Sequence, residues 1–147
     1  MATTFRTDLR AGIVTATTAF VTANPNLLNK CYAARPTSFN VPMPFAYVDL
    51  LAETATHTSG TRERVMAPSV VVVARPLDND QQVAAWDILV DLLADHFTGY
   101  PQFTSTTIWD RWTLTEEGEE IQTNDGVRVF PTVRFTFENV SIREGRS

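Results

Sequence analysis

The stretch NDQQVAAWDILVDLLADHF, residues 79–97, contains the clearest structural pattern of the chain. Its apolar residues recur at three- and four-residue steps, as they do on one face of an amphipathic helix. This face carries Val83, Trp86, Val90, Leu93 and Phe97. We expect Asp78 to cap the start of the helix, and Gly99 followed by Pro101 to end it.

Two further features of this helix bear on function. Ala85, Ile88, Leu89 and Leu92 widen its apolar arc to about 220°, more than the roughly 100° that packing on one core requires. We therefore expect this flank to be covered, either by the first helix of the same chain or by a partner. The opposite stripe is acidic and is expected to face solvent or a channel; it consists of Asp80, Asp87, Asp91 and Asp95.

The rest of the chain predicts one more helix and several strands. Residues 4–23 have helical apolar spacing and stop before Pro25. Strands are expected at 30–34, 45–53, 70–73, 104–115 and 127–143. The Thr-rich segment 54–64 is expected to be an exposed hairpin tip or a mobile arm. The predicted fold is a single α+β domain over residues 1–147, with two helices on a mostly antiparallel, mixed sheet in the order α-β-β-β-α-β-β.

The last two strands are expected to form a hairpin through an acidic loop at 116–120 and a turn at 124–126. The apolar residues change parity after Phe137, which predicts a bulge or break near Glu138. Pro131 lacks a backbone donor, so its strand is expected to lie at an edge or to be bulged there.

Charge is unevenly distributed along the 147 residues, whose formal net charge is −5. Residues 1–75 carry seven basic and four acidic side chains, whereas residues 76–147 carry five and thirteen. A computed pI near 4.9 disfavours sequence-specific nucleic-acid binding. The longest apolar run, Val70–Ala74, is too short to span a bilayer, and the single Cys31 excludes an internal disulfide.

No motif for nucleophilic catalysis, zinc binding or phosphate binding is present in the sequence, so we expect neither an enzyme nor a cofactor nor a metal site. His96 is expected to interact with a helix C-terminus or with solvent. Asp49 and Asp110 are expected to pair with arginines. Trp109 and Trp112 have opposite strand parity, which predicts that one fills the core and the other projects beside Arg111.

The surfaces of the chain indicate self-assembly, with a hydrated monomer as the alternative. Halves of opposite charge suit a head-to-tail contact that closes into a ring. We expect the segment 54–64 to order on docking, with Arg62 and Arg64 meeting acidic groups on a neighbour. The residues that we assign to this interface are His57, Arg62, Glu63, Arg64, Ile88, Leu92, Trp109 and Arg111.

The chain as a whole resembles the tail terminator proteins of long-tailed bacteriophages, also called minor tail or tail-completion proteins. The resemblance lies in its size, in the polar arm before Val70 and in four segments: TFRTDLRAGI (4–13), FAYVDL (45–50), DNDQQVAAWDILVDLL (78–93) and FPTVRFTFENV (130–140).

The resemblance implies a non-enzymatic protein that forms a six-fold ring on the tail tube, stops its polymerisation and offers the surface to which the head attaches. Its partners would be further copies of itself, the tail tube protein and a head-completion or connector protein. DNA would only pass through the ring, and no membrane is involved. The protein would be assembled in the host cytoplasm and located in the virion. Two alternatives remain, a head-completion or connector subunit and a small ligand-binding or enzymatic domain built around Trp109, Asp110 and Arg111.

Overall fold

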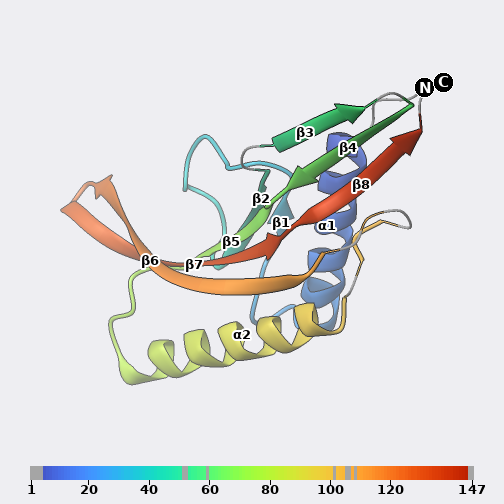
Figure 1. The fold of residues 1–147 in the computed structure, drawn as a ribbon. Helices are drawn as coiled ribbons and strands as arrows, with labels where there is room; N and C mark the ends of the chain where they lie inside the picture. The colour runs from blue at the N-terminus through green and yellow to red at the C-terminus, as the bar shows by residue number, and fades with distance from the viewer. Residues whose placement is uncertain are drawn as a thin grey trace.

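The computed structural model in Figure 1 contains two helices and two sheets, and it describes residues 5–50, 53–58, 60–100, 102–104, 107 and 109–145. The elements in chain order are α1 (Phe5–Ala23), β1 (Cys31–Tyr32), β2 (Phe45–Asp49), β3 (Glu53–Thr58), β4 (Thr61–Met66), β5 (Ser69–Val73), α2 (Asp80–Thr98), β6 (Arg111–Thr123), β7 (Gly126–Glu138) and β8 (Val140–Gly145). The predicted α+β class is confirmed. The predicted element order lacked three strands: the hairpin β3–β4, and β8 as a strand separate from β7.

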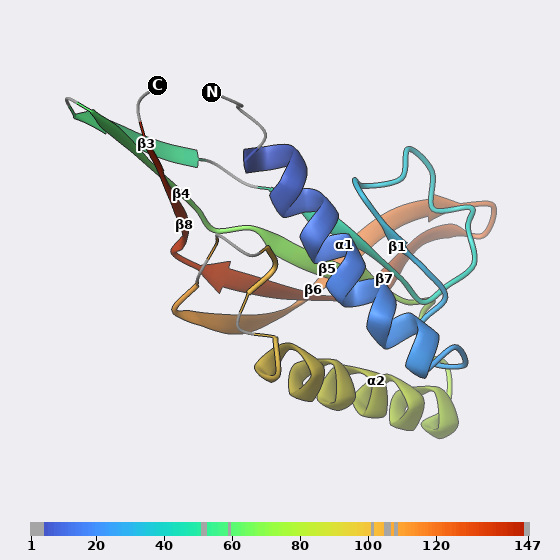
Figure 2. The same ribbon diagram turned by 90° about the vertical axis from the view of Figure 1, so that its right-hand side faces the viewer.

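The larger sheet has the strand order β1-β2-β5-β7-β6, and the smaller one has the order β3-β4-β8. Among the strands that the structure describes, only the β1–β2 pair is parallel. The two sheets are continuous with each other along the chain. β4 leads into β5 and β7 leads into β8, and β4 pairs with β8 while β5 pairs with β7, each antiparallel. The smaller sheet projects away from the helices along this ladder (Figure 2).

Both helices pack on the same face of the larger sheet. Their buried side chains include Leu9 and Ile13 of α1 and Leu93 and Phe97 of α2, and they share one cluster with Phe135 of β7. Gly12 allows α1 and the segment after α2 to approach each other closely, since a Cβ atom at Gly12 would lie 2.1 Å from the carbonyl oxygen of Phe103. The segment that follows α2 is thereby held against α1.

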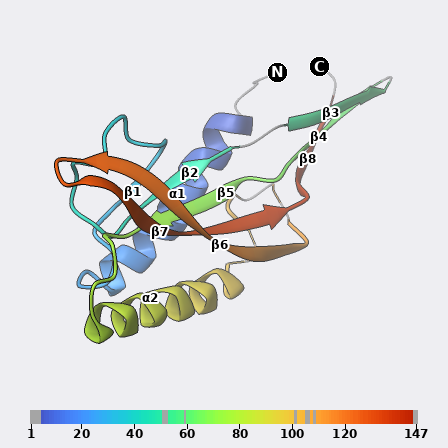
Figure 3. The same ribbon diagram turned by 90° about the vertical axis from the view of Figure 1, so that its left-hand side faces the viewer.

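The opposite face of the larger sheet is covered by the loop that precedes β2. Phe39, Val41 and Met43 of this loop pack on a second cluster that includes Phe45 and Val71. The sequence predicted interior strands at 45–53 and 70–73; β2 and β5 are covered on both faces as predicted, but β2 ends at Asp49, and Glu53 begins β3. Figure 3 shows this loop and the β6–β7 hairpin lying together at one end of the sheet.

The start of α2 differs from the prediction by one residue. Asn79, not Asp78, is the N-cap: its side chain accepts a hydrogen bond from the Gln82 amide at 2.9 Å. The Gln82 side chain accepts one in return from the Asp78 amide at 2.6 Å. The cap belongs to Asn79 because the helical register begins at Asp80, so that its third residue is Gln82.

The C-terminal strands differ more from the prediction. The acidic stretch 116–120 is not a loop, because β6 continues to Thr123 and the turn lies at 124–125. The strand begins at Arg111, seven residues later than predicted. The predicted break is confirmed at Asn139, whose φ of 59° separates β7 from β8. Pro131 lies at the end of the β5–β7 ladder, where its carbonyl oxygen accepts a hydrogen bond from the Ala74 amide at 3.0 Å and its missing donor interrupts no further pairing with β5 among the described residues.

Candidate interaction surfaces

The outer surface of α2 leaves large apolar side chains in water. Val83, Ile88 and Leu92 are 43%, 51% and 39% exposed, respectively. Val83 was predicted to face the core; it does not, because the β6–β7 hairpin curves away from the N-terminal half of α2 (Figure 1). Leu89 is buried instead. The predicted excess of apolar width is therefore present, and Ile88 and Leu92 are its uncovered part.

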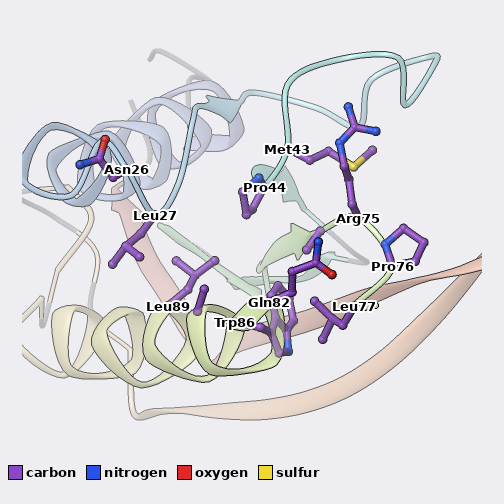
Figure 4. Close-up of a pocket in the computed structure, with 12 residues that line it drawn as sticks. Asn26, Leu27, Met43, Pro44, Arg75, Pro76, Leu77, Gln82, Trp86 and Leu89 are labelled. Atoms are coloured by element: carbon purple, nitrogen blue, oxygen red, sulfur yellow. The ribbon is translucent and has the colours of Figure 1, made fainter. Parts of the chain in front are cut away.

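An apolar groove of about 170 Å³ lies beside the first half of α2. Trp86 and Leu89 of the helix form one wall, and Leu27, Pro44 and Leu77 come from three other segments (Figure 4). Gln82 and Arg75 supply polar groups at this groove. Ala85 also lines it and lies about one helical turn from Ile88 and two turns from Leu92, so the exposed flank continues the groove surface.

The four aspartates of the acidic stripe, Asp80, Asp87, Asp91 and Asp95, are all exposed. Among the residues that the structure describes, none of them forms an ion pair. Other carboxylates are paired: Asp78 lies 3.1 Å from Arg128, and Asp49 lies 3.1 Å from Arg134. Negative charge is therefore concentrated, without an internal counter-ion, along one side of α2.

The segment 54–64, predicted to be an exposed hairpin tip or a mobile arm, lies in the hairpin β3–β4, which is paired on one side with β8. His57 lies opposite Arg62, and Thr56 lies opposite Glu63. Arg62 is half-buried and Glu63 is exposed, whereas the side chain of His57 lies outside the described residues. His57, Arg62 and Glu63 thus lie near one another on one projecting hairpin; Arg64 belongs to the same hairpin, but its side chain is buried.

Arg64 is turned inward, at 8% exposure, where the projecting sheet meets α1. Its Nε lies 2.5 Å from Oε2 of Glu53, and its guanidinium lies 4.8 Å from the ring centre of Phe5. Arg6 of α1 donates to Oε1 of the same carboxylate at 2.9 Å. The hydrogen bonds from Arg64, followed by those from Arg6, outweigh the effect of burial and lower the pKa of Glu53 to about 2. Arg64 therefore anchors the sheet and is not available to a partner.

Trp109 and Trp112 do not point in opposite directions as predicted. Both are half-buried on the main core: Trp109 stacks on Phe103 with ring centres 6.3 Å apart, and Trp112 lies 5.5 Å from Phe135. The parity argument fails because Trp109 precedes the first residue of β6, where strand alternation does not apply. Within the described residues, the buried Nε1 of Trp109 has no hydrogen-bond acceptor.

Arg111 and Asp110, which were proposed for a small-molecule site near Trp109, each bind a different side chain. Arg111 is exposed and lies 3.2 Å from Glu138, and Asp110 accepts a hydrogen bond from Asn139 at 2.8 Å. The predicted arginine partner of Asp110 is thus replaced by an asparagine. These side chains do not converge on a shared reactive point.

A charged cluster around Tyr47 was not predicted as a unit. Arg134 bridges Asp49 at 3.1 Å and Glu117 at 3.3 Å, so the predicted Asp49–arginine pair is confirmed. Hollows of about 200 and 270 Å³ lie against Tyr47. Burial, opposed by nearby arginines, raises the pKa of the Tyr47 phenol. In each pair, the arginine neutralises a carboxylate on a strand that is distant in sequence. The sequence pattern alone did not reveal this arrangement.

His96 and Cys31 both have structural positions. Nε2 of His96 lies 2.7 Å from the Ala16 carbonyl oxygen, so the ring joins the end of α2 to α1. Cys31 is buried, and burial raises its thiol pKa to about 11. Glu117 and Glu119 pair with Arg134 and Arg35, respectively, so these two carboxylates do not gather toward a metal. No group of three or more potential ligands occurs among the described residues.

No protein-family model matches the chain, and no curated protein matches it either. Within the described residues, no helix is both long enough and apolar enough to cross a membrane. The surfaces described above are therefore the basis of the functional proposal.

Proposed function

We propose that this protein is a structural subunit that assembles with copies of itself at the head-proximal end of a bacteriophage tail, as its resemblance to tail terminators suggests. The observation that carries this proposal is the placement of exposed apolar side chains on two separate elements. Val127 and Val129, on the projecting β6–β7 hairpin, are 61% and 55% exposed. Ile88 and Leu92 form the second patch, on α2.

Two unlike apolar patches on one chain suit a heterologous contact between copies, which forms a ring when its rotation closes. A two-stranded ribbon is marginally stable by itself, so the projecting hairpin gains stability when it packs on a neighbour. Arg128 on this hairpin is already paired with Asp78. The contact at the hairpin would therefore depend on its valines more than on charge.

Light scattering coupled to size-exclusion chromatography, with electron microscopy of the peak fraction, tests self-assembly directly. We expect rings whose population rises with protein concentration. The double variant Val127→Lys/Val129→Lys should remain folded but lose at least tenfold in assembly affinity, because both valines are exposed. Thr115→Lys, an exposed change on β6, is the matched control. A protein that remains monomeric at high concentration would exclude the proposal.

The terminator role is separated from the connector role by adding the protein to polymerising tail tube protein. A terminator should bind tube ends and limit tube length, whereas a connector should bind the head portal and leave tube growth unchanged.

The acidic stripe of α2 would face either solvent or the channel, where negative charge keeps passing DNA from binding. Charge reversal of Asp87 and Asp91 should slow DNA passage without changing tube length; unaltered ejection would exclude the channel position.

A further inference from the structure

The projecting three-stranded sheet has two open edges. Among the described residues, β3 and β8 each pair with β4 alone. The register aligns the two outer strands: Glu53 and Val140 both lie beside Met66, and Thr58 and Gly145 both lie beside Thr61. The outer strands are therefore parallel to each other and equal in length, with six residues each.

Little apolar surface supports the outer part of this sheet. Its inner end is fixed by Met66, which is buried, and by the Glu53–Arg64 pair. Further out, Thr54, Ala55, Thr56 and Glu63 are exposed. A small sheet without a hydrophobic face is weakly stable, and its outer backbone groups offer a template for another strand.

The other two sheet edges are less suited to pairing. The β1 edge is only two residues long, and β6 carries four glutamates, a typical protection against edge-to-edge contact. By contrast, β3 (ETATHT) and β8 (VSIREG) contain neither proline nor lysine. The one acidic residue of β3, Glu53, is already neutralised by Arg64 and Arg6.

We infer that β8 of one copy pairs in parallel with β3 of the next copy, so that the small sheets of neighbouring subunits form one continuous sheet. A second copy is the occupant that satisfies both edges with a single repeated contact. A foreign strand would cover only one edge. Two-fold pairing of β3 with β3 would be antiparallel and would leave β8 open. This inference rests on the proposed ring assembly and adds a second contact between neighbouring copies to the apolar one.

Single-cysteine variants mixed in pairs test this contact. Thr54→Cys and Thr56→Cys place a thiol at alternate positions of β3, which covers a register shift of two residues, and Ser141→Cys places one on β8. The native Cys31 is buried, and the unmodified protein measures its background. One partner carries a size tag, so that mixed and self cross-links differ in mass.

We expect mild oxidation to cross-link one of the β3 variants to Ser141→Cys, since paired strands bring Cα atoms within disulfide reach. Thr113→Cys on β6, mixed with Thr54→Cys, should give no more product than the background. Circular dichroism of each variant verifies its fold. Amide hydrogen exchange of the unmodified protein provides a second readout: β3 and β8 should exchange at least tenfold more slowly once assembled, and the β6 edge should not change.

The outcomes separate this contact from the proposed function. Rings with mixed β3–β8 cross-links and slowed exchange support both. Rings without such cross-links, or with β3–β3 products and unchanged exchange at β8, overturn the β3–β8 contact and leave ring assembly standing. A strict monomer without cross-links overturns both.

Discussion

The carboxylate of Glu53 bridges two arginines from different parts of the chain, Arg64 of β4 at 2.5 Å and Arg6 of α1 at 2.9 Å. The side chains of Glu53 and Arg64 are 13% and 10% exposed, so this pair is largely withdrawn from water. A withdrawn pair is costly to break, because one charge is then left without its partner. The pair joins β3 to β4, and Arg6 connects it to α1.

The first prediction concerns the pH dependence of this pair. The pKa of Glu53 is lowered from 4.5 to about 2, so its contribution to the free energy of unfolding is complete above about pH 4.5 and is lost as the pH falls toward 2. We expect Glu53→Gln to lower the free energy of unfolding by about 2 kcal/mol at pH 7. The variant should also flatten the dependence of this free energy on pH between 4.5 and 2. Urea unfolding at several pH values measures both effects.

The exposed Glu63 on the neighbouring strand provides the control, because Glu63→Gln changes the same charge without opening the buried pair. Its unfolding curve should stay within about 0.5 kcal/mol of the parent curve. An unchanged acid slope in Glu53→Gln would show that this carboxylate does not stabilise the fold through its charge.

The second prediction concerns Gly12. In an isolated helix, a glycine-to-alanine change stabilises by about 1 kcal/mol. Here the added Cβ would meet the carbonyl oxygen of Phe103 at 2.1 Å, so Gly12→Ala should destabilise by about 2 kcal/mol or more. Gly99→Ala is the control, since its Cβ would lie 3.5 Å from the nearest carbonyl oxygen, with φ at −85°. Equal melting temperatures for both variants would contradict the close approach.

The sequence predicted the two helices and the buried strands because their apolar spacing is local. For residues 54–64 it left two alternatives, an exposed hairpin tip and a mobile arm, and assigned no strands, since Thr54 to Arg64 lacks apolar alternation. β3 pairs with β4, and β4 also pairs with β8, which is more than 70 residues away in the chain. The acidic stretch 116–120 was assigned to a loop because charge suggested a tip, whereas pairing with β7 extends the strand through it.

The exposure of the candidate interface residues was predicted in part. The exposed flank at Ile88 and Leu92 follows from helical geometry, which the sequence reveals. The inward turn of Arg64 does not follow from the sequence, because its partners Glu53 and Phe5 meet only when the sheet docks on α1, where Arg6 also binds Glu53. A polar segment near a glycine signals exposure on average, and a single buried ion pair within it leaves no periodic trace.

The third prediction concerns the reactivity of Cys31. A thiol pKa of about 11 leaves roughly 0.1% thiolate at pH 8, and burial also blocks access to the sulfur. We expect a disulfide reagent such as dithionitrobenzoate to react at least 100-fold more slowly with the native protein than with the urea-unfolded protein. Rapid stoichiometric release of thionitrobenzoate from the native protein would show that β1 opens readily.

The fourth prediction separates the two roles of the apolar residues on α2. Leu89 is 1% exposed and belongs to the core, so Leu89→Ala should lower the free energy of unfolding by about 2–5 kcal/mol. Ile88→Gln and Leu92→Gln change side chains that are 51% and 39% exposed, and each should cost less than about 1 kcal/mol. If this flank packs on a neighbouring copy, the double variant should nevertheless weaken assembly at least tenfold, because buried apolar anchors contribute more than 1 kcal/mol each to an interface.

Light scattering across a concentration series, combined with thermal unfolding of the same samples, distinguishes these effects. Leu89→Ala should shift the melting temperature strongly, and any loss of assembly should follow from unfolding. The glutamine variants should shift the assembly midpoint while their monomers melt like the parent. Glutamine leaves the charge of Asp91 and Asp95 unaltered, so a change in assembly would be due to lost apolar contact. Parent-like assembly in the double variant would place the flank in solvent and would leave the β6–β7 hairpin as the apolar contact between copies.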